Sequence, residues 1–123
     1  MIGKIYYCLT PFYNSLVHKK GFKGRPVLII GIADSGDFNV LPVPRITSSI
    51  NIDHDFDIPI DPVKYPKLGL SDFSYIRVHK QTTVNRGDLA NQIGDMKVDY
   101  DDLYLSILTK LEEYNIKLIN DAL

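Results

Sequence analysis

The sequence predicts a small, mainly β fold of the α+β class, an antiparallel β-barrel or sheet packed against one C-terminal helix. Up to residue 96, short apolar segments rich in β-branched and aromatic residues alternate with clusters of turn residues. Helical periodicity is confined to the segment that follows. Because the 123 residues are 45% hydrophobic and show no repeat or linker, we expect a single domain over residues 1–123.

Three strands are expected in the N-terminal half, from apolar segments rich in β-branched and aromatic residues at 2–10, 26–32 and 38–44. Pro11 is expected to end the first strand, and residues 12–24 to form a loop or a long hairpin tip. Residues 26–32 are apolar almost without a break, which is typical of a strand buried on both faces. Pro42 and Pro44 cannot donate ladder hydrogen bonds, so the third strand should lie at a sheet edge or contain a bulge.

The next part of the chain predicts shorter strands. Isoleucines spaced mostly by two between aspartates indicate a short exposed strand within residues 50–60. Residues 74–78 are expected to form a strand that residues 82–84 continue after a bulge. Residues 85–88 are typical of a turn, and residues 92–96 of a last short strand.

One helix is predicted from Asp99 to about Ile119. Apolar residues recur there along a single helical stripe, namely Tyr104, Ile107, Leu108, Leu111, Tyr114 and Leu118. Asp99 is expected to cap the N-terminus, and Asp101 and Asp102 suit the positive end of the helix dipole.

The net charge of −1 conceals an alternation along the chain. Residues 1–50 carry six basic and two acidic residues, and residues 74–97 carry four and two, whereas residues 51–73 and 98–123 are acidic. If the two basic stretches fold together, they form a positive surface that attracts a polyanion despite the nearly neutral total. The alternative is an ordinary solvated surface that the acidic loop and helix dilute.

Motifs disfavour several kinds of site. The single cysteine, Cys8, allows neither an internal disulfide nor a cysteine-based zinc cage, and its β-rich setting is typical of a core thiol. The acidic run 53–57 lacks the glycine and glutamate of a calcium loop, with Ile58 and Lys64 in their places. There is no H-E-x-x-H pair, no G-x-G-x-x-G and no Walker A sequence. We therefore expect no metal and no cofactor.

No segment of the sequence predicts a membrane span. The longest apolar run, residues 26–30, is far shorter than the roughly 20 residues of a membrane helix. The first four residues do not open a signal peptide. These features favour a soluble cytoplasmic protein without a membrane partner.

Two segments place reactive groups at strand ends. Arg25 precedes the apolar run 26–30, and Thr47, with Ser48 beside it, follows the strand that ends near Pro44. If the two strands pair as in a hairpin, these ends face one cleft. An arginine offers a planar fork of donors to a phosphate, and a hydroxyl orients or relays a proton at short range.

The order of these motifs resembles that of the MazF/PemK-like toxins of type II toxin–antitoxin systems. The matching segments are, in order, Arg25-Pro26-Val27-Leu28, Ile46-Thr47-Ser48, Ser74-Tyr75-Ile76, Thr83-Val84-Asn85-Arg86 with Leu89, and Ile93-Gly94-Asp95-Met96 before the helix. Where family members often carry a glutamine and an arginine in the later strand, this chain has Lys80 and Thr82.

The resemblance implies an SH3-like antiparallel β-barrel with a C-terminal helix, a homodimer, and a cognate antitoxin that occupies the basic groove. It also implies a growth-inhibiting, metal-independent endoribonuclease that acts on single-stranded RNA such as mRNA. In that reaction the ribose 2′-hydroxyl attacks the adjacent phosphate and leaves a cyclic phosphate and a 5′-hydroxyl. Arg25 and Thr47 match the family's essential arginine and threonine, Ser48 is the alternative hydroxyl, and His79 is a candidate proton shuttle.

Basic and aromatic side chains complete the expected RNA surface. The cations expected to bind RNA phosphates are Lys19, Lys20, Lys23, Arg45, Arg77, Lys80 and Arg86. Four aromatic residues are either base-stacking groups or parts of the core, namely Tyr6, Tyr7, Phe12 and Tyr13. The alternative function is a noncatalytic SH3-like barrel that binds RNA or a protein partner. A phage or conjugative-element protein with another role is a third possibility.

Overall fold

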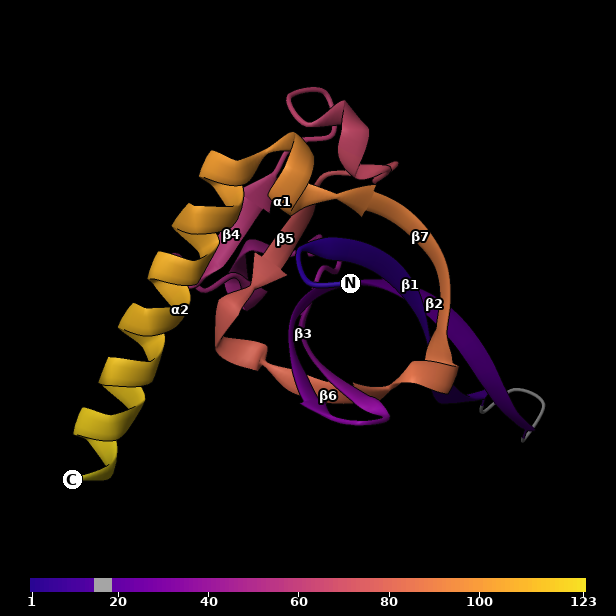
Figure 1. The fold of residues 1–123 in the computed structure, drawn as a ribbon, viewed down its shortest axis with the longest axis horizontal. Helices are drawn as coiled ribbons and strands as arrows, with labels where there is room; N and C mark the ends of the chain where they lie inside the picture. The colour runs from indigo at the N-terminus through magenta and orange to yellow at the C-terminus, as the bar shows by residue number, and fades with distance from the viewer. Residues whose placement is uncertain (15–18) are drawn as a thin grey trace.

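Five antiparallel strands form one strongly curved sheet that winds into an open barrel (Figure 1). The computed structural model describes residues 1–14 and 19–123, and the side chains of residues 1–9 and 24–123. The order across the sheet is β6 (Thr82–Asn85), β3 (Asp37–Pro42), β2 (Lys19–Asp34), β1 (Lys4–Asn14) and β7 (Leu89–Asp95). Within the described residues no ladder joins the two edge strands, β6 and β7, so the barrel is not closed.

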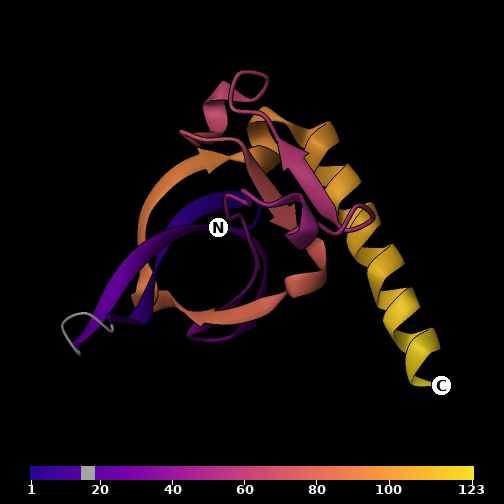
Figure 2. The ribbon, with the colours of Figure 1, turned by 180° about the vertical axis from the view of Figure 1, so that it is seen from behind.

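A second, two-stranded antiparallel sheet lies between the barrel and the C-terminal helix (Figures 1 and 2). It pairs β4 (Asp57–Ile60) with β5 (Ser74–Arg77). The short helix α1 (Met96–Asp99) follows β7, and α2 (Asp101–Ala122) packs its first turns beside this sheet. The predicted architecture, antiparallel strands followed by one main helix, is thereby confirmed.

The core lies on both faces of β2. Leu28 belongs to a cluster that also holds residues of β4, β5 and α2, Ile107 among them. Val27 and Ile29 alternate with Leu28 and belong to a smaller cluster around Phe38. Burial of one such side chain contributes roughly 1.5–3 kcal/mol. The prediction of a strand buried on both faces is confirmed for this central part of β2.

β1 and β2 form a longer hairpin than predicted. β1 continues through Pro11, which pairs with Phe22 of β2, so the prediction that Pro11 ends the strand was wrong. Residues 12–14 and 19–24 belong to these paired strands, so of the two predicted alternatives for residues 12–24 the hairpin applies and the loop does not. In the described ladder, β7 pairs with β1 only as far as Cys8. Pro11 therefore lies where β1 has a single partner, and a proline is tolerated at such an edge.

β3 is an inner strand, so of the two predicted possibilities, an edge strand or a bulged one, the second applies. It pairs with β2 on one side and with β6 on the other, but β6 covers only residues 37–40. Pro42, opposite Val27, lies beyond the last residue that β6 pairs, so it interrupts no ladder on that side. The β2–β3 ladder also contains two register shifts, in keeping with the predicted irregularity.

Two shorter predictions are corrected as well. The strand expected within residues 50–60 is limited to β4, because residues 49–51 form a 3-10 turn, and both Asp57 and Ile60 are buried. Residues 82–84 do not continue β5. The 3-10 turn Val78–Lys80 redirects the chain, and β6 joins the large sheet beside β3.

The main helix begins later than predicted because Tyr100 interrupts it. Asp95 caps α1, its carboxylate accepting a backbone N–H of the first turn (3.3 Å). Asp99 ends α1 and caps nothing, since Tyr100 occupies the N-cap position of α2. The Tyr100 hydroxyl accepts the N–H of Lys67 (3.1 Å), and its ring meets that of Tyr65 edge-on, with centroids 5.1 Å apart. These contacts hold Tyr100 outside helical geometry.

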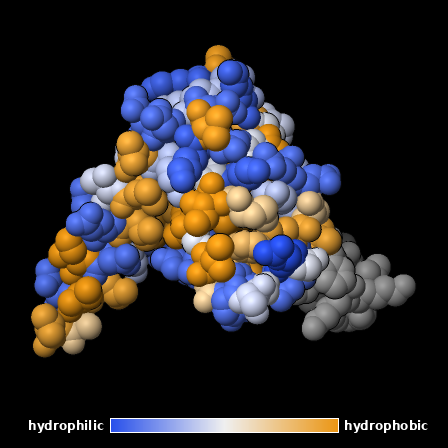
Figure 3. Space-filling model, in the orientation of Figure 1, coloured by the Kyte–Doolittle hydropathy of each residue, from blue (hydrophilic) through white to orange (hydrophobic). Residues whose placement is uncertain are grey.

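The C-terminal turns of α2 extend past the small sheet (Figures 1 and 2). Tyr104 and Ile107 are buried, but several apolar side chains farther along are exposed, namely Ile116, Leu118, Ile119 and Leu123. Figure 3 shows hydrophobic surface along this end of the helix. Within the described residues, no helix is both long and apolar enough to cross a membrane.

Candidate nucleic-acid interface

Arg25 and Thr47 line the same cavity, which has a volume of about 520 Å³. Arg25 lies on β2 opposite Cys8, two residues before the buried Val27. Thr47 comes from the segment after β3, which the N–H of Tyr75 ties to β5 through the Pro44 carbonyl (2.9 Å). Strand pairing thus brings together two residues that lie far apart in the sequence.

The wall of this first cavity carries further polar groups. Tyr7 of β1 lines it, as do Ser71, Asp72 and Ser74 ahead of and at the start of β5. The Ser71 hydroxyl donates to the Asp72 carboxylate (3.2 Å), and the Ser74 hydroxyl donates to the Asp72 carbonyl (2.9 Å). The first cavity therefore presents hydroxyl groups and one carboxylate in addition to its arginines.

A second cavity of about 370 Å³ adjoins the first. Pro44, Arg45 and Thr47 line both, and the second adds Asn51, Arg77 and Lys80, together with Ile46. The two cavities form a groove with four cations, Arg25, Arg45, Arg77 and Lys80. Asp72 is the one acidic residue among the described residues that line it, and its carboxylate lies 3.5 Å from Arg45. Cations outnumber acidic groups there, so the groove is suited to a polyanion.

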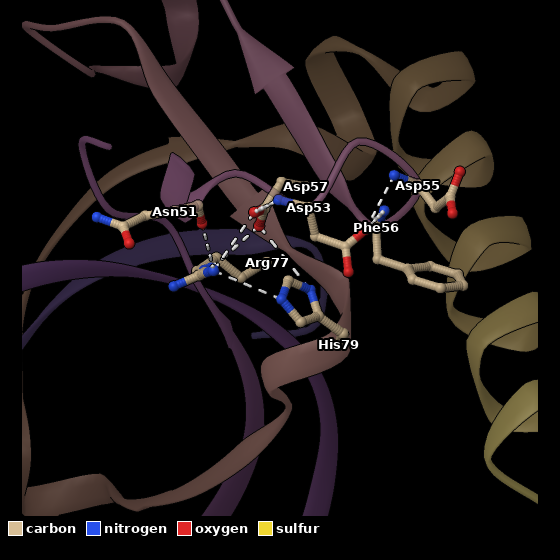
Figure 4. A network of polar contacts seen from close by, with 7 residues as sticks. All are labelled: Asn51, Asp53, Asp55, Phe56, Asp57, Arg77 and His79. Atoms are coloured by element: carbon tan, nitrogen blue, oxygen red, sulfur yellow. Dashed lines mark hydrogen bonds and ion pairs between the residues drawn. The ribbon is translucent and has the colours of Figure 1, made fainter. Parts of the chain in front are cut away.

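Two residues that line the second cavity, Asn51 and Arg77, belong to a network of polar contacts (Figure 4). The Asp57 carboxylate, whose side chain is 0% exposed, accepts from Arg77 Nε (3.0 Å) and Nη2 (3.4 Å). It also accepts the N–H of Asp53 (2.8 Å). Arg77 Nη2 donates as well to the Asn51 carbonyl (3.2 Å). One buried carboxylate therefore fixes the guanidinium of a cavity-lining arginine.

His79 belongs to this network and lines neither cavity. Its Nε2 lies 3.5 Å from Arg77 Nη2, and its Nδ1 lies 3.9 Å from Asp57 Oδ1. Nδ1 is buried without a hydrogen-bond partner among the described atoms. The rings of Phe56 and Tyr114, which meet edge-on with centroids 5.1 Å apart, lie near the imidazole, with centroids 6.4 and 6.3 Å from its own. His79 is therefore a neighbour of Arg77 and does not line the cavity that Arg25 and Thr47 share.

The other predicted residues lie in different places. Ser48 precedes the 3-10 turn at residues 49–51 and lines neither cavity. Arg86 stands over the Phe38 ring, 5.1 Å from its centroid, near the start of β3 and thus at the opposite end of that strand from Thr47. The backbone of Lys19, Lys20 and Lys23 belongs to β2, but their side chains lie outside the described residues, as do those of Phe12 and Tyr13.

Two of the N-terminal aromatic residues are described, and they face different surroundings. Tyr7 lines the first cavity, where an unpaired base could contact it. The Tyr6 hydroxyl donates to Gln92 Oε1 (3.4 Å), and its ring packs on the smaller core cluster with Cys8. Burial, and next the charge of Asp88, raise the pKa of the Cys8 thiol, in keeping with the predicted core role.

Sequence patterns did not point to Asp57 as a site residue. It belonged to an acidic run that was expected to be exposed, whereas its side chain is buried opposite Arg77 in the β4–β5 ladder. The alternating isoleucines could have indicated which face of the strand Asp57 occupies. They could not have indicated that its partner is Arg77, 20 residues away. Within the described part of the chain, no three acidic, histidine or cysteine side chains gather as a metal site would require.

Comparison with solved structures shows what this arrangement resembles. A Mycobacterium tuberculosis toxin, MazF-mt6, matches with 20% sequence identity and a TM-score of 0.55, covering 90% of this chain and 90% of that chain. An endoribonuclease in complex with its cognate antitoxin, from a mycobacterial species, matches with 16% identity and a TM-score of 0.60, covering 93% of this chain and 92% of that chain. No protein-family model and no curated protein sequence matches the chain.

Both likenesses extend over nearly the whole chain, so they describe the complete arrangement of barrel, small sheet and helix. At 16–20% identity they concern the fold and not the identity of individual site residues. The chain has the fold of the MazF toxins.

Proposed function

We propose that this protein is a toxin of the MazF type, an endoribonuclease that cleaves single-stranded RNA in the first cavity. The observation that carries the proposal is that Arg25 and Thr47 line one cavity of a chain with this fold. The fold alone supports many functions, so the chemistry of the cavity has to supply the argument. An arginine and a hydroxyl at one end of a cationic groove suit phosphodiester chemistry.

The proposed reaction uses a nucleophile that RNA itself provides. The ribose 2′-hydroxyl attacks the adjacent phosphate, the P–O5′ bond breaks, and the products are a 2′,3′-cyclic phosphate and a 5′-hydroxyl. The proton of the 2′-hydroxyl leaves to a base, and the departing 5′-oxygen takes up a proton. Arg25 stabilises the negative charge that grows on the phosphate oxygens. Thr47 donates to the reacting group or relays a proton. Because these groups suffice for charge stabilisation and proton relay, we propose that the reaction needs no metal.

The rest of the groove supplies binding. Arg45 and Lys80 offer charge to the RNA phosphates, and Tyr7 offers a ring to a base near Arg25. Lys19, Lys20 and Lys23 are proposed as further phosphate contacts. Ser48 and His79 are not placed in the reaction, since neither lines a cavity.

Two protein partners are proposed. A cognate antitoxin is expected in the cytoplasm, with an acidic or amphipathic segment that competes with RNA for the cationic groove. A second copy of the chain is expected to cover the exposed apolar end of α2, because an unpartnered apolar helix face is typical of an interface. The homodimer would be held at least in part by these helices.

The proposal is tested by incubating the purified protein with a long single-stranded RNA in EDTA. Arg25→Ala is expected to slow cleavage about 10²–10³-fold, the usual effect of removing a group that stabilises transition-state charge. Thr47→Ala is expected to slow it about 10²–10⁴-fold, the usual range for acid–base groups. Circular dichroism checks that both variants fold.

Two comparison variants make the result specific. Ser48→Ala removes the neighbouring hydroxyl outside the cavities, and Lys110→Ala removes a positive charge from the exposed face of α2. Both should cleave RNA like the wild type. A folded wild-type protein that cleaves none of several RNAs would exclude the enzyme and favour a noncatalytic binding module. Cleavage that survives both Arg25→Ala and Thr47→Ala would contradict the proposed site.

A further inference from the structure

Arg77 differs from the other cations of the groove in how firmly it is held. Its Nε and Nη2 both donate to the Asp57 carboxylate, and Nη2 also donates to the Asn51 carbonyl. The Arg77 side chain is 24% exposed, compared with 61% for Arg45. An arginine fixed by a two-point contact with a carboxylate loses little freedom when it binds a ligand. Arg77 is therefore preorganised.

The guanidinium has one group left for a ligand. Figure 4 shows Nε and Nη2 turned toward Asp57 and Asn51, while the remaining terminal nitrogen, Nη1, points away from the carboxylate. No hydrogen bond of Nη1 is formed within the described residues. Arg77 lines the second cavity together with Lys80 and Thr47. Nη1 thus has no partner among the described residues, on a side chain that lines the second cavity.

The opposite side of Arg77 is closed by the protein. Asp57 is fully buried, and its Oδ2 is also engaged by the N–H of Asp53. His79 lies against the pair, with Nε2 close to Arg77 Nη2 and with the Phe56 and Tyr114 rings near it. The carboxylate cannot turn toward the cavity or reach a ligand there. Asp57 can therefore influence a ligand in the second cavity only through Arg77.

We infer that the second cavity is a subsite for one RNA phosphate next to the scissile one, contacted by Arg77, and that Asp57 is the residue that positions Arg77 for it. The inference rests on the proposed function, since it assigns a part of the same RNA groove. Thr47 lines both cavities, which places this subsite directly beside the proposed cleavage site. Lys80 and Arg45 add charge at its rim.

The positioning role predicts that loss of the Asp57 charge weakens RNA binding, whereas net charge alone predicts that it strengthens binding. Replacing Asp57 with asparagine makes the protein more positive, and a more positive protein should hold a polyanion more tightly. If Asp57 positions Arg77, the same substitution should weaken binding, because an amide holds the guanidinium less firmly than a carboxylate does. Whether the affinity of Asp57→Asn for a polyanion falls or rises therefore distinguishes the positioning role from a simple effect of net charge.

The test measures binding of a mixed-sequence, single-stranded oligodeoxynucleotide by fluorescence anisotropy. This probe lacks the 2′-hydroxyl, so its binding does not depend on cleavage. Asp57→Asn is expected to weaken binding about tenfold, the effect of losing roughly one charge-assisted hydrogen bond. Asp72→Asn is the matched variant, because it removes the same charge from the exposed partner of Arg45. It should bind the probe as tightly as the wild type or more tightly.

A second pair of variants keeps the total charge constant. Arg77→Lys retains the charge but loses the fork that Asp57 holds, and it is expected to weaken binding about tenfold. Arg86→Lys makes the same change at an exposed arginine that lies over the Phe38 ring and lines neither cavity, so it should alter binding less than threefold. This pair also serves if Asp57→Asn fails to fold, which circular dichroism would show.

The outcomes separate this inference from the proposed function. Tighter binding by folded Asp57→Asn, or unchanged binding by Arg77→Lys, would overturn the positioning role. No binding of the probe by the wild type would overturn the subsite. If the expected binding pattern appears in a protein that cleaves no RNA, the subsite stands and the nuclease proposal fails. Where RNA is cleaved, Asp57→Asn should raise KM more than it lowers kcat, which a general loss of structure would not do.

Discussion

Gly94 of β7 passes so close to Leu68 that a Cβ at residue 94 would stand 2.7 Å from backbone atoms of Leu68. Those atoms belong to the 3-10 turn Pro66–Leu68, whose leucine is fully buried in the larger core cluster. The obstacle is main chain and not the tip of a flexible side chain, so it cannot move aside at low cost. A glycine is required here by close packing of two backbones.

Gly94→Ala is therefore expected to lower the free energy of unfolding by about 1–3 kcal/mol, the usual cost of overpacking. Urea unfolding followed by circular dichroism would measure the change. Gly31→Ala is the matched variant, since the nearest atom to a Cβ at that strand position is 3.6 Å away, an ordinary contact. Equal stability of Gly94→Ala and the wild type would show that the two segments do not pack this closely.

The same glycine shows where sequence reasoning succeeds and where it stops. The Ile93-Gly94 pair was recognisable as one of five ordered motifs, but nothing in the sequence pointed to Leu68 as the reason for the glycine. The meeting of Arg25 and Thr47 was predictable, because Arg25 lies just before the part of β2 that pairs with β3, and Thr47 follows β3 at the same end of that hairpin.

Asp57 illustrates the limit more sharply. Its contact with Arg77 depends on the register of a ladder closed by a long connection, and a shift of one residue would turn either side chain to the other face. The helix start was missed for a similar reason. Tyr100 leaves helical geometry because of contacts with Tyr65 and Lys67, which no local pattern around Asp99 reveals.

Asp53 organises the turn that leads into β4, and its contribution depends on pH. Its Oδ1 accepts the N–H groups of Asp55 (2.9 Å) and Phe56 (3.1 Å). Burial acts to raise the pKa of this carboxyl, but the two hydrogen bonds, helped by His79 and His54, hold the pKa below its ordinary value of 3.8. The ionised form therefore stabilises the fold above that value, and the effect is lost as the pH falls through the lower folded pKa.

Asp53→Ala is accordingly expected to lower the free energy of unfolding by about 1 kcal/mol at pH 7, the typical cost of losing such a cap. The difference from the wild type should shrink at pH 3, where the carboxylate is increasingly protonated. Urea unfolding at the two pH values measures both quantities. Asp99→Ala, which removes an exposed carboxylate that caps nothing, should differ little from the wild type at either pH. A loss for Asp53→Ala that is as large at pH 3 as at pH 7 would argue against this role.

The cationic groove predicts a steep dependence of RNA binding on salt. Four cations line the two cavities, and each phosphate that they neutralise releases bound counterions from the RNA. With about 0.7 per contact for a single strand, four contacts give a slope of roughly −3 for log affinity against log salt. Anisotropy titrations from low to physiological salt would measure the slope, and Arg45→Ala should make it shallower by about 0.7. A flat response would contradict phosphate binding in the groove.

The projecting end of α2 predicts that the protein pairs with itself. Ile116, Ile119 and Leu123 recur at helical spacing and are 52%, 59% and 99% exposed in one copy, so their burial against a second copy would be favourable. Ile119→Asp places a charge in that contact and is expected to convert a dimer into a monomer, as measured by light scattering after size-exclusion chromatography.

The fold of Ile119→Asp should remain, because the side chain of Ile119 contributes little to the core of its own chain. Asn115→Asp introduces the same charge one turn earlier, at a polar exposed position, and should leave the dimer intact. A wild type that is monomeric at high micromolar concentration, or an Ile119→Asp variant that remains dimeric, would contradict a dimer contact at this end of α2.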